Sequence, residues 1–126
     1  MDKLEQIFIM QKNLIDRYRK DGIGNNTPEK RLEHLQQTAQ AIIMEGAELL
    51  DWLPWKHWSV KSGNKQIEPQ DFLTERHIAE IKVEVVDLIH FIVEEAINLG
   101  MTADDFYTAY MAKHAENHVR QDTGKY

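Results

Sequence analysis

The chain has 126 residues, 42% of them hydrophobic, so its composition supports one compact domain over residues 1–126. Fifteen basic against 21 acidic residues give a net charge of −6, which disfavours binding to the phosphate backbone of nucleic acids. No run approaches the roughly 20 apolar residues of a membrane span, the first residues lack the order of a signal peptide, and cysteine is absent. A cytoplasmic protein without nucleic-acid or membrane partners is therefore expected.

The N-terminal half contains two predicted helices. The first spans about residues 3–20, with apolar side chains at helical spacing, and residues 22–26 end it. Thr27 then caps the second helix with Pro28 at its first position, and Pro54 marks its end. Because no segment shows the period-two alternation of strands, the sequence predicts an all-α fold, a compact bundle of four main helices.

The C-terminal half supplies the other two predicted helices. The third begins near Asp71 and runs to Gly100, a residue suited to the left-handed conformation that ends helices. Thr102 and Asp105 have the spacing of a capping box that opens the fourth. Residues 81–93 are apolar around nearly the whole helix, which indicates burial within this chain or against a second subunit. A homodimer is therefore expected.

Two pairs of carboxylates stand within the apolar runs of the second and third helices. They are Glu45 with Glu48 and Glu84 with Asp87. Residues three positions apart lie on nearly the same helical face, so both members of a pair can point at one place. Four like charges in a partly dry space repel unless a divalent cation such as Mg²⁺ or Mn²⁺ neutralises them. The alternative interpretation is that the acidic stripes face solvent.

Three tryptophans follow the first carboxylate pair within seven residues. They are Trp52, Trp55 and Trp58. Trp52 is expected to close one end of a small core. Trp55 and Trp58 beside Lys56 suit a planar base and its phosphates.

The C-terminal tail is comparatively basic. Lys113, Arg120 and Lys125 fall within it, so it is expected to bind a small polyanion. His114 and His118 are four residues apart, as in zinc peptidases, but no glutamate directly follows the first histidine. We interpret this histidine pair as part of a polar, partly exposed helix face.

Several segments together resemble a known family. The ExxE and ExxD pairs, with WKHW, EVVDLIHF, NLGMTADDFYTAY and the terminal KHAENHVRQDTGKY, resemble the dimeric all-α dUTPases and related phage dCTPases of the MazG-like all-α nucleoside triphosphate pyrophosphatase superfamily. The resemblance covers residues 41–126 well and the first helix more weakly. It implies hydrolysis of a deoxynucleoside triphosphate to its monophosphate and pyrophosphate. The expected substrate is dUTP, with dCTP or another deoxynucleoside triphosphate such as dGTP as the alternative.

The same resemblance implies roles for individual residues. The expected Mg²⁺ ligands are Glu45, Glu48, Glu84 and Asp87. Glu48 is the candidate to orient or deprotonate the attacking water. The expected phosphate contacts are Lys56, Lys113, Arg120 and Tyr126. The expected base and sugar contacts are Gln11, Trp55, His90, Phe91 and Asn117.

One position departs from the pattern of the dUTPases. They usually place Asp or Asn four residues after the glutamine that Gln11 matches, and this chain has Ile15 there. Losing a polar contact at that position would change the preferred base, because specificity by hydrogen bonding is worth orders of magnitude.

An alternative of another class is a non-catalytic helical dimerisation module, which would not need the basic tail. The expected location under the enzyme interpretation is the cytoplasm of a bacterial cell or of a phage-infected host.

Overall fold

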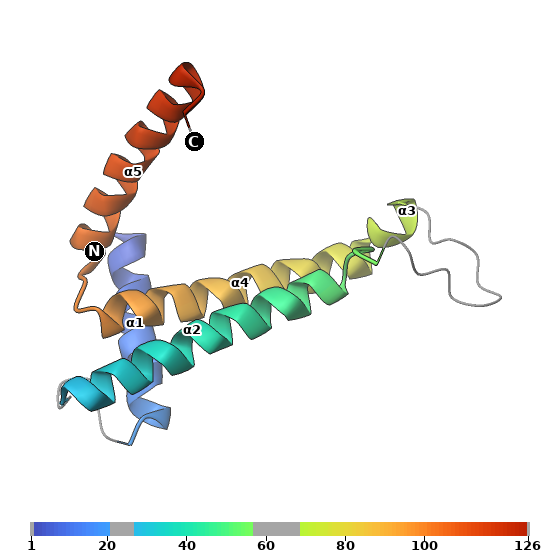
Figure 1. The fold of residues 1–126 in the computed structure, drawn as a ribbon. Coiled ribbons are helices and arrows are strands. Elements are labelled where there is room, and N and C mark those ends of the chain that lie inside the picture. The colour runs from blue at the N-terminus through green and yellow to red at the C-terminus, as the bar shows by residue number, and fades with distance from the viewer. Residues whose placement is uncertain (1, 21–26, 57–68, 126) are drawn as a thin grey trace. The chain divides into compact units, whose positions relative to one another are not determined.

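Figure 1 shows a computed structural model of the protein, which describes residues 2–20, 27–56 and 69–125. In these ranges the chain forms four long helices, one short helix and no strand. The helices are α1 (Lys3–Tyr18), α2 (Pro28–Asp51), α3 (Pro69–Phe72), α4 (Glu75–Asn98) and α5 (Ala103–Thr123). The predicted all-α fold with four main helices is confirmed. In the same part of the chain, no helix is both long and apolar enough to span a membrane.

The chain divides into two units. The first comprises Met1–Leu35 with Val93–Tyr126, and the second comprises Gln36–Ile92. Helices α2 and α4 contribute residues to both units, α1 and α5 belong to the first, and α3 belongs to the second. The expectation of one domain over residues 1–126 stays a prediction.

Local capping signals place most helix ends where the sequence predicts them. The Thr27 hydroxyl accepts a hydrogen bond from the Lys30 backbone N–H at 3.2 Å, so the predicted cap of α2 is confirmed. Thr102 and Asp105 form a reciprocal capping box at the start of α5, with bonds of 3.0 and 2.9 Å. Gly100 has a φ of 79°, the left-handed conformation that ends α4.

The predicted single helix from Asp71 to Gly100 is wrong at its N-terminal end. Helix α3 stops at Phe72, and α4 begins only at Glu75. Thr74 separates them because its hydroxyl accepts the His77 backbone N–H at 3.3 Å and so caps α4. The rings of Phe72 and Trp52 both meet His77 edge-on, at centroid distances of 5.7 and 5.4 Å. This half-buried contact joins α3 and the turn after α2 to the first turn of α4.

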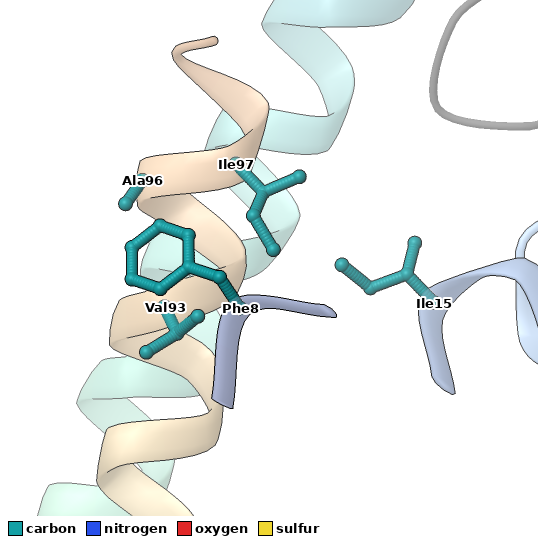
Figure 2. Close-up of a cluster of buried hydrophobic side chains, with 5 residues drawn as sticks. All are labelled: Phe8, Ile15, Val93, Ala96 and Ile97. Carbon is teal, nitrogen blue, oxygen red and sulfur yellow. The ribbon is translucent and has the colours of Figure 1, made fainter. Parts of the chain in front are cut away.

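A hydrophobic core lies in the first unit, where α1 packs on the last turns of α4. Figure 2 shows its five buried side chains, which are Phe8, Ile15, Val93, Ala96 and Ile97. Phe106 of α5 joins the core through its ring, 5.8 Å from that of Phe8. Two residues of the apolar side predicted for α1, Phe8 and Ile15, are therefore buried against α4, whereas Ile7 and Leu14 are each 42% exposed.

The apolar surface of α4 in the second unit remains exposed. Three apolar residues, Val83, Val86 and Ile89, are 54%, 55% and 46% exposed. The sequence left two expectations for this helix, burial within the chain or burial against a second subunit. The first is wrong for the described residues, because these three residues stay exposed. The other expectation, burial against a second subunit, stays a prediction.

Candidate metal centre

Three carboxylates of the second unit converge from two helices. Glu45 comes from α2, while Glu84 and Asp87 lie one turn apart on α4. One carboxylate oxygen from each lies within 4.8 Å of the other two. All three side chains are half-buried. The structure therefore brings together three of the four ligands that the sequence predicts.

The chemistry of this cluster fits a divalent cation. The Oε2 atoms of Glu45 and Glu84 are buried, and neither has a hydrogen-bond partner among the described residues. Buried carboxylate oxygens without donors are costly, and a cation would compensate them. A donor set made only of carboxylate oxygens suits hard ions, which take oxygen ligands, better than it suits ions that prefer nitrogen or sulfur.

Electrostatics point to the same conclusion. Burial raises the pKa of Glu45, and the hydrogen bond with Glu48 and the negative charges of Glu48, Asp87 and Glu84 raise it further. Glu48 itself is exposed and lies outside the group of three converging oxygens. The carboxylates thus repel one another in the metal-free chain, and Glu48 stands at the margin of the cluster.

Four other predicted site residues belong to the second unit. The Lys56 ammonium lies 5.1 Å from the centroid of the Trp55 ring, a cation–π contact on exposed side chains. His90 is exposed and Phe91 is half-buried, three and four residues after Asp87 on α4. That spacing places both near the face that carries Asp87.

All but one of the remaining predicted residues belong to the first unit. Gln11 on α1 is 4% exposed, and Ile15 one turn later is completely buried in the core. The departure from the dUTPase pattern is therefore a core side chain. On α5, Lys113 and Arg120 both bind Glu116, at 3.3 and 2.6 Å. Asn117 is exposed on the same helix. The predicted residues Tyr126 and Trp58 lie outside the described residues.

A partly buried polar network in the first unit was missed by the sequence interpretation. The Tyr18 hydroxyl donates to Glu94, and Arg19 Nη2 lies 3.4 Å from the same Glu94 oxygen. Arg19 Nη1 also donates to the side chain of Asn98 at 2.9 Å, and Arg31 Nε donates to the Asn98 carbonyl at 3.2 Å. The available signal was Glu94 itself, a charged residue directly after the apolar run of residues 81–93, because a buried charge needs a partner.

Partial burial raises the pKa of Tyr18, and the hydrogen bond to Glu94 and the charge of Glu94 raise it further. Tyr18 therefore remains a hydrogen-bond donor throughout the neutral range. With Arg19 it gives Glu94 donors, which the buried Oε2 atoms of Glu45 and Glu84 do not receive from any described residue.

The fold and the site together define a class: an all-α protein with a carboxylate cluster suited to a divalent metal on two helices. The comparison with protein families is more specific. A family described as dUTPase matches residues 3–102, and the chain belongs to that family.

Individual relatives match shorter stretches. A dCTP pyrophosphatase of Enterobacteria phage LZ5 is 41% identical over 73 residues, which is 58% of this chain and 41% of the relative. A dCTP pyrophosphatase of Enterobacteria phage T4 is 34% identical over 70 residues, or 56% and 41% of the two chains. A DNA replication protein of the same phage is 32% identical over 59 residues, or 47% and 15%. The chain thus spans about two fifths of the length of the two pyrophosphatases. No solved structure matches it.

Proposed function

We propose that the protein hydrolyses a deoxynucleoside triphosphate to the monophosphate and pyrophosphate. The observation that carries this proposal is the convergence of Glu45, Glu84 and Asp87, whose oxygens lie within 4.8 Å of one another. Membership of the dUTPase family and the similarity to two phage dCTP pyrophosphatases support the substrate class. Because a triphosphate is a polyanion, an acidic cluster can approach it only through a cation.

Mg²⁺ is the proposed ion, with Mn²⁺ as a substitute, held by Glu45, Glu84 and Asp87 and completed by Glu48. When bound, such an ion neutralises the triphosphate and activates water for attack on phosphorus. Glu48 is the proposed group that orients or deprotonates this water. Two observations support that role, its exposure and its hydrogen bond with Glu45 at the margin of the cluster.

The positive side chains are proposed to hold phosphate oxygens. They are Lys56, Lys113 and Arg120, and the hydroxyl of Tyr126 is proposed to join them as a neutral donor. Lys113 and Arg120 are half exposed, at 53% and 41% of their side-chain surface, and each is paired with Glu116. Exposed ion pairs contribute at most about 1 kcal/mol, so exchange of Glu116 for a phosphate costs little.

The base and sugar are proposed to contact aromatic and amide side chains. They are Gln11, Trp55, His90, Phe91 and Asn117. The ring of Trp55 beside Lys56 supports this assignment, because it offers a stacking surface next to a cation.

Two pyrimidine substrates are candidates, each favoured by a different finding. The dUTPase family match favours dUTP. The two relatives named dCTP pyrophosphatase favour dCTP. We keep dUTP as the first candidate and dCTP as the second.

We also propose that the protein acts as a homodimer in the cytoplasm of a phage-infected or bacterial cell. The exposed apolar residues of α4, Val83, Val86 and Ile89, support a subunit interface, since monomers rarely expose such clusters. Light scattering should give twice the mass of the chain, and Val86→Asp should yield a monomer. A monomeric wild type would overturn this part of the proposal.

The activity is tested by pyrophosphate release from dUTP, dCTP, dTTP, dATP and dGTP, with Mg²⁺ and with EDTA. We expect metal-dependent release that is greatest for one pyrimidine. Glu48→Gln should abolish it, whereas Glu80→Gln, the same change at an exposed position of α4, should not. Release in EDTA, or full activity of Glu48→Gln, would contradict the proposed mechanism. No release from any of the five would favour the non-catalytic dimerisation module.

A further inference from the structure

Two imidazole rings are in contact on the exposed surface of α5. His114 and His118 are one helical turn apart, and their Nε2 atoms lie 3.1 Å from each other. The rings meet edge to face, with centroids 4.6 Å apart. Both side chains are exposed, so a solute can reach the two nitrogens.

The separation of the two nitrogens suits ligation of one metal ion. Nitrogen–metal bonds of imidazole are roughly 2.0–2.1 Å long. Nitrogens 3.1 Å apart then subtend about 100° at a shared ion, between the roughly 90° and 109° of octahedral and tetrahedral coordination. The two side chains therefore need little rearrangement to bind.

The side chains can also present the correct atoms. A neutral imidazole can carry its proton on Nδ1, which leaves the lone pair of Nε2 free for a metal. The ring of Tyr110 lies nearly parallel to that of His114, at 13° and a centroid distance of 6.0 Å. This stacking restricts the orientation of His114 before any ion arrives.

The charges of neighbouring side chains are compatible with binding of a cation between the two histidines. Lys113 and Arg120 are the nearby positive groups, and both are bound to Glu116. Asp122 lies one turn beyond His118 on the same helical face. Within the described chain, no third carboxylate or imidazole atom lies within 4.8 Å of both nitrogens. The protein thus offers two ligands, and water would complete the coordination.

We propose that His114 and His118 form a second metal site, of a chemical type distinct from the carboxylate cluster. Paired imidazoles favour Zn²⁺, Ni²⁺ or Cu²⁺, whereas Mg²⁺ prefers oxygen ligands. Helix α5 has no buried residue, so a metal that links two of its turns also stabilises the helix. This inference is independent of the proposed hydrolysis.

The test is calorimetric titration of NiCl₂ into the untagged full chain, stripped with EDTA, desalted and supplied with excess MgCl₂. Excess magnesium competes with nickel for the carboxylate cluster, and the Glu84→Gln variant below shows whether any nickel is counted there. We expect one Ni²⁺ per chain. The matched control is the double variant His118→Ala/Val119→His, which keeps six histidines but turns one imidazole about 100° around the helix. Its nickel affinity should be weaker by about tenfold or more.

A second variant, His114→Gln, should show the same loss, and far-UV circular dichroism should show both variants folded. Glu84→Gln should bind nickel as the wild type does. The inference is overturned if the wild type binds no nickel, if the double variant binds it equally well, or if only Glu84→Gln loses binding.

Discussion

The two units of the chain hold buried carboxylates in opposite states. In the first unit, the side chain of Glu94 is 4% exposed and is bound by the Tyr18 hydroxyl and the Arg19 guanidinium. In the second unit, Glu45 and Glu84 each keep a buried oxygen that no described group donates to. Glu84 and Glu94 stand on the same helix, so neither residue type nor secondary structure separates them.

The difference between them lies in their neighbours. A buried carboxylate that receives donors holds elements of the fold together, because its desolvation is compensated within the chain. Carboxylates that face one another without donors raise each other's proton affinity and favour a cation. Glu94 is therefore assigned to stability and Glu84 to binding.

The largest expected effect is on hydrolysis. Glu84→Gln should lower the rate of pyrophosphate release from the best substrate by at least about 1,000-fold, since a lost metal ligand removes several kcal/mol of transition-state stabilisation. Steady-state release with saturating Mg²⁺ measures it. Glu80→Gln, one turn earlier on α4 and exposed, should stay within about twofold of wild type. A Glu84→Gln rate within tenfold of wild type would remove this residue from the site.

The next effect is on folding. Arg19→Ala should lower the free energy of unfolding by about 3 kcal/mol, because it leaves the buried charge of Glu94 without its cation. Urea denaturation gives the value. Lys30→Ala is the matched control, since it breaks a pair with Glu33 whose side chains are 52% and 49% exposed. Its cost should be below about 1 kcal/mol, and equal costs for the two variants would contradict the contrast between buried and exposed pairs.

A smaller effect is expected from the metal itself. At 100 times its dissociation constant, Mg²⁺ should stabilise the folded chain by about 2.7 kcal/mol, and EDTA should reverse the gain. Thermal unfolding with and without the ion measures it. Glu94→Gln should keep this stabilisation, whereas Glu84→Gln should lose most of it. If both variants responded alike, the two carboxylates would not differ in the way proposed.

The smallest effect concerns Tyr18 at alkaline pH. Its pKa is raised in the folded chain, so its contribution to stability is present below pH about 10 and is lost as pH rises further. Tyrosinate absorbance should show no ionisation of Tyr18 in the ordinary tyrosine range, as judged by subtraction of the Tyr18→Phe curve. The signal should appear only above that range or on unfolding. A normal titration of Tyr18 would mean that its hydroxyl does not serve Glu94.

The amino-acid sequence determined the helices, most of their ends and the placement of acidic residues in pairs on two of them. Thr27, Thr102 and Gly100 could be interpreted correctly because capping depends on residues within about four positions. The break at Thr74 was missed because a single hydroxyl makes it, with no glycine or proline between Phe72 and Glu75. The family could also be inferred, since its motifs are local segments of sequence.

Only the tertiary structure decided which of these carboxylates converge. It brings Glu45 to Glu84 and Asp87, leaves Glu48 at the margin, and gives Glu94 to Arg19, 75 residues earlier in the chain. It also buries Ile15 completely while leaving Val86 exposed, although both are apolar residues on helices. The physical reason is that local periodicity fixes the face on which a side chain lies, whereas its charge partner and its burial depend on contacts between distant segments.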